Sequence, residues 1–327
     1  SEAVRGEGGY LLNNKGERFM ANYAPSKMEL APRDVVAKAI ETEIAEGRGF
    51  GKGLDAYVVA DVRHLPKEVV LEKLHGIREL AITFEHADPL TQPIPIRPTC
   101  HYSMGGIDVV DYKTCGTVVP GLFAAGEASC VSIHGANRLG GNSLADAVVF
   151  GKVAGEGAVA YVAEHSQADA KQALDDAAKY WENRFTEVTS RKDGRPIAEI
   201  RDEMANAMWN KVGIFREAGK MQEALDTLNK LIEEYKTCFV GDTNRTFNMA
   251  FVNYVEVGSL LTVAKAAVMG AMRRKESRGS HLREDFPKRD DKNFLNHTLI
   301  TLNANGEYEV GQRDVVVTRF EPKERTY

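Results

Sequence analysis

The stretch His134-Gly-Ala-Asn-Arg-Leu-Gly-Gly-Asn-Ser143 constrains the fold more than any other part of the chain. It is rich in glycine, and it runs directly into a long segment of small and apolar residues, Leu144 to about Glu164. Asn142 and Ser143 are residue types that cap helix starts, so we predict a glycine-rich loop followed by a long helix. The N–H groups and the positive dipole end at such a start attract anions.

The residues before this stretch alternate between short apolar runs and glycine-rich turns, from Pro93 to about Gly141. The segment Gly121-Leu-Phe-Ala-Ala-Gly-Glu127 predicts a buried strand that runs into a glycine turn. A second glycine-containing segment, His101-Tyr-Ser-Met-Gly-Gly106, places a histidine beside a backbone that can approach a ligand closely.

The first 95 residues mix strand and helix patterns. Residues 9–19 predict two short strands around a polar turn, and 56–62 predict a further strand. Asp34 is a credible helix cap, because apolar residues follow it at helical spacing, and 66–84 predict a second helix.

The second half of the chain changes to a helical pattern. Residues 168–277 predict three or four amphipathic helices in an antiparallel bundle, with breaks near Gly194, Gly219 and Gly241. Strands are predicted at 298–302 and 307–317, after a run of nearly balanced charges from Arg283 to Lys292 that predicts a solvated or interface segment. The fold class is therefore α+β.

Composition and charge exclude several classes of protein. The net charge is −5, from 42 basic and 47 acidic residues, which argues against a nucleic-acid-binding protein. The four cysteines form no C-x-x-C pair, so we expect no metal or iron–sulfur site within the chain. The longest apolar segment, Val255 to Met272, carries Glu256 and Lys265 and predicts a buried helix rather than a membrane span.

Arg33, His101 and Arg138 stand beside glycine or proline in segments that suit a ligand site. A guanidinium offers a fork of donors to a carboxylate, so these three side chains together would suit a dianion. Taken singly, each arginine can also be an ordinary surface or ion-pair residue.

Six segments in this order resemble the succinate dehydrogenase/fumarate reductase flavoprotein family. They are Ser1–Leu11 (Ser-Glu-x-x-Arg-Gly-Glu-Gly-Gly-Tyr-Leu), Leu30-Ala-Pro-Arg-Asp34, Pro98–Gly106, Gly121–Glu127, His134–Leu144, and the late segment Glu276–Asp285 with Lys288–Asp291. The resemblance covers nearly the whole chain. It implies a capping domain (1–95), the return segment of a flavin-binding domain (96–164), a helical bundle (168–277) and a small strand-containing C-terminal subdomain (278–327).

The resemblance also implies roles for individual residues. Arg33 would move the proton to or from the substrate, and Glu2 and Arg5 would relay that proton to solvent. Because arginine is ordinarily always protonated, transfer through Arg33 requires a concerted handover to a neighbour such as Glu2.

By the same resemblance, His101 and Arg138 would bind the substrate carboxylates, and the hydroxyl of Ser1 would touch the substrate. FAD would be the cofactor, held in part by Glu127, Ser143 and Leu144. The family's N-terminal part supplies the Gly-x-Gly-x-x-Gly unit for the FAD pyrophosphate and a flavin-linking histidine, so we expect these residues alone not to hold FAD tightly.

The implied activity is interconversion of succinate and fumarate, with hydride exchange at the flavin and electrons passing to an iron–sulfur subunit and a quinone. Membrane anchor subunits would hold this complex, with the flavoprotein peripheral on the cytoplasmic side of the inner membrane. Two alternatives stay open: a relative of L-aspartate oxidase, and a non-catalytic fragment whose helices dock an iron–sulfur subunit. The direction of the reaction does not follow from these residues.

Overall fold

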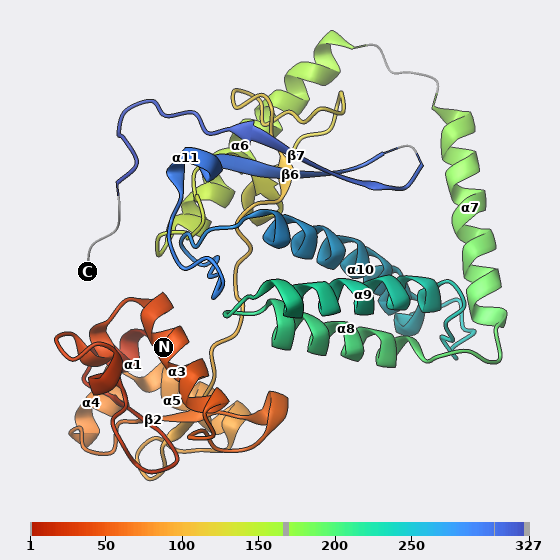
Figure 1. Ribbon diagram of the computed structural model, residues 1–327. Helices are drawn as coiled ribbons and strands as arrows, with labels where there is room; N and C mark the ends of the chain where they lie inside the picture. Colours follow the sequence, from red (N-terminus) through yellow and green to blue (C-terminus); the bar gives the residue numbers. More distant parts are fainter. Residues whose placement is uncertain (1, 166–169, 304, 324–327) are drawn as a thin grey trace. The chain divides into compact units, whose positions relative to one another are not determined.

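The computed structural model describes residues 2–165, 170–303 and 305–323. The chain divides into two compact units, Ser1–His101 and Tyr102–Tyr327, and each unit is described by itself. Figure 1 labels the main helices and strands.

The first unit is built around a three-stranded antiparallel sheet in the order β1-β2-β3. Its elements are α1 (Glu2–Gly6), β1 (Tyr10–Leu12), α2 (Met20–Tyr23), η1 (Met28–Leu30), α3 (Arg33–Ala45), η2 (Gly53–Asp55), β2 (Val58–Asp61), α4 (Lys67–Glu72), α5 (His75–Glu85) and β3 (Ile94–Ile96). Leu11 pairs with Ala60, and Val59 pairs with Pro95. Buried apolar side chains from the strands and from α3 and α4 form one core.

The predicted strand at 56–62 is confirmed as β2, but three local predictions need correction. The helix predicted at 66–84 is divided into α4 and α5. The second strand of the predicted hairpin at 9–19 is reduced to a single bridge between Leu12 and Arg18. Asp34 is not the helix cap: Pro32, with φ −53° and ψ 149°, holds that position, and Asp34 lies in the first turn of α3. Proline fixes φ at a value that leads directly into a helix, so the helix begins two residues earlier than predicted.

The second unit begins with short elements that pack on one long helix. These are β4 (Ile107–Asp108), η3 (Gly126–Ala128), β5 (Ser129–Cys130) and α6 (Asn142–Glu164), with β4 parallel to β5. The strand predicted at 121–127 is wrong. Backbone groups there bond locally, from Ala124 N–H to the Cys115 carbonyl and from Thr117 N–H to the Leu122 carbonyl, so the segment forms a tight loop. The long helix predicted from Leu144 is confirmed as α6.

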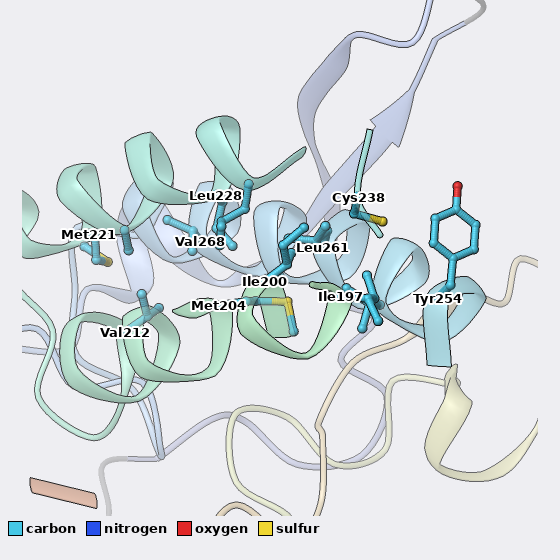
Figure 2. Close-up of a cluster of buried hydrophobic side chains, with 14 of the residues drawn as sticks. Ile197, Ile200, Met204, Val212, Met221, Leu228, Cys238, Tyr254, Leu261 and Val268 are labelled. Atoms are coloured by element: carbon cyan, nitrogen blue, oxygen red, sulfur yellow. The ribbon is translucent and has the colours of Figure 1, made fainter. Parts of the chain in front are cut away.

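Four further helices follow: α7 (Lys171–Ser190), α8 (Ile197–Val212), α9 (Ala218–Tyr235) and α10 (Met249–Arg273). Figure 2 shows the core that α8, α9 and α10 share, with Ile200, Met204, Leu228, Leu261 and Val268 buried. These helices confirm the predicted helical pattern. Most of α7 is exposed, and it buries only Val188 and Thr189, near its end.

Helix α10 is long and apolar enough to cross a membrane by length and composition alone. One face is buried in the core, through residues such as Val257 and Leu261, whereas Leu260 and Val263 on another face are exposed. The prediction of a buried helix is therefore confirmed for one face only.

The chain then forms α11 (Asp291–Phe294) and a hairpin of β6 (Asn296–Leu302) and β7 (Tyr308–Asp314), in which Ile300 pairs with Val310. Both predicted C-terminal strands are confirmed. The hairpin is tied to the start of the unit, because the Arg313 guanidinium donates to Asp108 at 2.6 Å.

Candidate functional site

In the first unit, the structure brings Glu2 and Arg33 together. Nε and Nη2 of Arg33 both donate to Oε2 of Glu2, at 2.9 Å and 2.5 Å. Both side chains are more than half exposed. The hydrogen bond and the charge of Arg33 lower the pKa of the Glu2 carboxyl below its ordinary value. The pair is therefore an ionised carboxylate and a guanidinium, open to solvent and in direct contact.

Arg5 lies on the same short helix as Glu2 and fixes that helix to η1. Its Nη1 donates to the backbone carbonyls of Glu29 and Ala31, at 2.5 Å and 3.0 Å. Burial lowers the pKa of the Arg5 guanidinium, and the nearby carboxylate of Glu2 opposes this shift. Because Ala31 lies two residues before Arg33, this contact also holds the start of α3 near α1.

Glu29 is the buried anchor of this arrangement, and sequence reasoning missed it. Its side chain is 3% exposed and accepts hydrogen bonds from Arg18 and from the Leu11 N–H. Its position before Leu30-Ala-Pro-Arg-Asp34 gave no signal of burial, because a lone glutamate ordinarily faces solvent. Ser1, the predicted substrate contact, lies outside the described residues. His101 is exposed and lies at the end of the first unit.

In the second unit, the segments ending at Gly106 and Glu127 lie against each other. The Ser103 N–H donates to Oε1 of Glu127 at 2.8 Å. Gly106 has φ +136°, and a Cβ there would lie 2.5 Å from the Ala128 carbonyl oxygen. Only glycine permits this approach, which pairs β4 with β5 just beyond it.

A polar cluster of Tyr102, His134 and Asp146, in which Asp146 is buried and the other two are half-buried, lies against the loop that carries Arg138. The Tyr102 hydroxyl donates to Oδ2 of Asp146 at 3.1 Å and lies 3.2 Å from Nε2 of His134. Nε2 of His134 also lies 3.1 Å from the same carboxylate oxygen, and the Asp146 side chain is 1% exposed. Burial, followed by the hydrogen bond to Asp146, raises the pKa of the Tyr102 hydroxyl.

Arg138 packs on this cluster. Its guanidinium carbon lies 4.4 Å from the centre of the Tyr102 ring, and its Nη1 donates to the Leu139 carbonyl at 2.9 Å. A guanidinium over an aromatic face is held in orientation by the negative charge density of the ring. The segment that holds Tyr102 and the segment that holds Arg138 are therefore in contact.

The start of α6 could hold one edge of a flat cofactor. Helix α6 begins at Asn142 after Gly141, and no side chain among the described residues caps its first turn, so the predicted capping by Asn142 or Ser143 is wrong. Leu139, Leu144 and Val148 are each more than 70% exposed around this start. The N–H groups of Asn142 and Leu144 donate to the Leu139 and Gly141 carbonyls, both at 3.2 Å. The positive dipole end of the helix beside apolar surface suits a ring system that has polar edges, such as the isoalloxazine of FAD.

The predicted residues therefore form one group in each unit. Glu2, Arg5 and Arg33 meet in the first unit. In the second, Glu127 lies against the segment after His101, while Arg138 lies on the loop before Ser143 and Leu144. Sequence reasoning missed Tyr102, His134 and Asp146 as a cluster. Tyr102 and His134 stand inside two of the quoted segments, but Asp146 gave no signal beyond its place on a helix.

Comparisons with known proteins match both ends of the chain to families. Residues 1–144 match the family described as FAD binding domain, and residues 201–327 match the one described as fumarate reductase flavoprotein C-term. The match to the FAD-binding family covers Glu2, Arg33, Arg138 and the start of α6, which supports FAD as the cofactor.

Curated relatives agree with these families. The flavoprotein subunit of 8-methylmenaquinol:fumarate reductase from Wolinella succinogenes is 52% identical over 100% of this chain and 53% of its own length. The fumarate reductase flavoprotein subunit of Escherichia coli is 40% identical over 100% of this chain and 56% of its own. The succinate dehydrogenase flavoprotein subunit of Coxiella burnetii is 41% identical over 99% of this chain and 56% of its own length.

Solved structures share the fold. A quinol-fumarate reductase with menaquinol molecules matches with a TM-score of 0.90 and 40% identity, over 99% of this chain and 58% of that chain. The chain thus spans about half the length of the curated relatives it matches.

Proposed function

Because the chain belongs to the succinate dehydrogenase/fumarate reductase flavoprotein subunit family, we propose that it carries the dicarboxylate site of an FAD-dependent enzyme that interconverts succinate and fumarate. The observation that carries this proposal is the exposed pair of Arg33 and Glu2. Arg33 can give its proton to the substrate only if a neighbouring group replaces that proton at once, because a guanidinium otherwise stays protonated at neutral pH. Glu2, at 2.5 Å, supplies that neighbour.

In the proposed reaction, Arg33 delivers a proton to one carbon of the fumarate double bond. The Glu2 carboxylate takes up a proton from solvent and passes it to the neutral Arg33, so that both groups return to their starting forms. Arg5 fixes the backbone that presents both groups and keeps positive charge beside Glu2, which favours its ionised form. The bound flavin supplies hydride chemistry at the neighbouring carbon. General acid–base assistance of this kind contributes about 10²- to 10⁴-fold to a rate.

Arg138 and His101 are proposed to bind the substrate carboxylates, together with the hydroxyl of Ser1. Arg138 suits this role because its orientation is held by the Tyr102 ring, and a guanidinium is a strong hydrogen-bond donor to carboxylates. Fixing both carboxylates orients the double bond for proton and hydride transfer. This positioning lowers the activation barrier, because the substrate is already aligned and the bound charges stabilise the transition state.

Glu127, Ser143 and Leu144 are proposed to contact FAD. The start of α6 supports this assignment, because its N–H groups and positive dipole end favour an electron-rich ring edge. Glu127 accepts a hydrogen bond from Ser103. It would therefore couple the flavin contact to the segment that follows His101.

The partners are also proposals. An iron–sulfur subunit would pass electrons between this subunit and a quinone, and membrane anchor subunits would hold the complex, with the flavoprotein peripheral on the cytoplasmic side. The matched solved structure, a quinol-fumarate reductase with menaquinol molecules, supports the link to a quinone.

The test is an assay of the complete natural subunit, in its complex, for fumarate reduction by a reduced viologen dye and for succinate oxidation by an acceptor dye. We expect fumarate-dependent oxidation of the viologen and inhibition by malonate. Peroxide formation that depends on L-aspartate, with no turnover of fumarate or succinate, would instead identify an amino-acid oxidase.

A further inference from the structure

The four residues Arg278–His281, here called the clamp turn, form a tight reversal in the C-terminal part of the second unit. The Arg278 N–H donates to the His281 carbonyl at 2.8 Å, and the His281 N–H donates to the Arg278 carbonyl at 3.0 Å. Two reciprocal backbone bonds fix the turn, so its tip, Gly279-Ser280, has a defined position.

The base of the clamp turn is held by buried charges. The Glu276 carboxylate, 0% exposed, accepts hydrogen bonds from Arg278 at 2.8 Å and 2.9 Å and from Arg274 at 2.7 Å. His281 lies on the other side, with Nδ1 accepting from Arg216 at 2.8 Å. Charge-assisted bonds of this kind are stronger and more directional than neutral ones, so the base is rigid.

The tip of the clamp turn touches the loop that carries Arg138. The Ser280 N–H and hydroxyl both donate to the Ala136 carbonyl, at 2.9 Å and 2.7 Å. Ala136 lies two residues before Arg138, and 144 residues separate it from Ser280. The two bonds hold one peptide group of the loop against the rigid turn.

Gly279 allows this contact. Its φ is +58°, and a Cβ at this position would lie 2.6 Å from the Ala136 carbonyl oxygen and 2.7 Å from its carbon. Both are backbone atoms, which cannot move aside as a flexible side chain can. Any larger residue at 279 must therefore push the loop or the turn out of place.

We propose that the clamp turn positions Arg138 for dicarboxylate binding, with Gly279 and Ser280 as positioning residues that act through the Ala136 carbonyl. The inference rests on the proposed function of Arg138. The Tyr102 ring orients the guanidinium from one side, and the clamp turn fixes the backbone from which the side chain extends. The clamp turn, near the C-terminal end of the chain, thereby fixes the loop that carries Arg138.

The test compares Gly279→Ala with Gly306→Ala in the complete subunit in its complex. Gly306 lies between β6 and β7 and has φ +78°, but a Cβ there would meet nothing within 4 Å. Both substitutions strain a left-handed backbone, and only the first disturbs the loop.

We expect Gly279→Ala to weaken malonate binding, measured by calorimetry, by about 10- to 100-fold, as misplacement of a binding group by about an ångström does. The KM for fumarate should rise similarly, whereas kcat changes less, because Arg138 binds the carboxylate in both ground and transition states. Gly306→Ala should leave both constants unchanged.

Ser280→Ala provides a second route that keeps the fold, since Ser280 is exposed and its N–H bond to Ala136 survives. We expect a smaller loss of malonate affinity, about 3-fold for one neutral hydrogen bond, and recovery in Ser280→Thr, which restores the hydroxyl. Normal malonate affinity in both Gly279→Ala and Ser280→Ala would overturn the inference, provided that the unsubstituted complex binds malonate and reduces fumarate. Failure of the unsubstituted complex to do either would instead refute the proposed function.

Discussion

The guanidinium of Arg33 donates two hydrogen bonds to a single carboxylate oxygen of Glu2, from Nε at 2.9 Å and from Nη2 at 2.5 Å. Both side chains are more than half exposed, and solvent-exposed ion pairs contribute little to stability. The pair is therefore poorly suited to a structural role. It is well suited to proton exchange, because its members are in contact with each other and open to water.

Glu2→Gln should slow fumarate reduction by about 10²- to 10⁴-fold, because the amide cannot return a proton to Arg33. The thermal midpoint of the complex should not change. Viologen-linked steady-state assays measure the rate. Glu79→Gln, which removes another exposed carboxylate in the same unit, should leave it unchanged. A Glu2→Gln enzyme with full activity would show that the relay does not pass through this carboxylate.

Asp146→Ala should destabilise the subunit by about 1–3 kcal/mol, because it leaves the half-buried Tyr102 hydroxyl and His134 ring without their shared acceptor. Urea unfolding followed by tyrosine fluorescence measures the change. The control is Asp226→Ala on α9, where the carboxylate accepts an exposed bond from Gln222. Equal urea midpoints for the two variants would mean that the Tyr102–His134–Asp146 cluster does not stabilise the folded subunit.

Leu261→Ala should destabilise the helical core by about 2–5 kcal/mol, whereas Leu260→Ala should change stability by less than about 0.5 kcal/mol. The two leucines are adjacent on α10, but Leu261 is 1% exposed and Leu260 is 46% exposed. Their contrast tests which face of the helix packs on α8 and α9. Equal losses in urea midpoint would contradict the described burial.

Local rules recovered those elements whose signals are contained in short segments. Helical spacing predicted α8, α9 and α10, because their apolar residues lie on one buried face. The C-terminal strands were also predicted, although none of their residues is fully buried. The rules failed at 121–127, where an apolar run forms a loop: its backbone groups bond to residues 115 and 117, which no local pattern reveals. They also failed at Asp34, where the fixed φ of Pro32 outweighed the capping tendency of aspartate.

The candidate site was predictable where single residues stand in recognisable segments, as Arg33 and Arg138 do. Contacts between distant segments were not predictable, since their signals lie in pairing rather than in composition. Arg283 illustrates this: the charged run around it suggested a solvated segment, yet its side chain is 2% exposed and pairs with Asp285 at 2.6 Å. The clamp turn on Ala136 is a contact of the same kind.

His281 should make stability depend on pH. Burial, followed by the positive charge of Arg216, lowers the pKa of His281 from 6.5 to about 4. Between these values the unfolded chain binds a proton that the folded chain excludes, so stability is full above about pH 6.5 and is lost as the pH falls toward 4. Urea midpoints across this range should fall less steeply for His281→Gln. His75→Gln, which alters a histidine that is 66% exposed, should retain the wild-type slope. Parallel slopes for wild type and His281→Gln would contradict the prediction.

The most direct test of the central claim is a single-turnover measurement on the complete complex carrying Arg33→Gln. The flavin is first reduced, fumarate is then added, and its reoxidation is followed by absorbance. Arg63→Gln serves as the control, because Arg63 also pairs with a carboxylate in the first unit, Asp61, and is 47% exposed. We predict that Arg33→Gln still binds malonate but slows reoxidation by at least about 10²-fold, whereas Arg63→Gln reoxidises at the wild-type rate. Reoxidation of the Arg33→Gln flavin at the wild-type rate would contradict the proposed role of Arg33 as the proton donor.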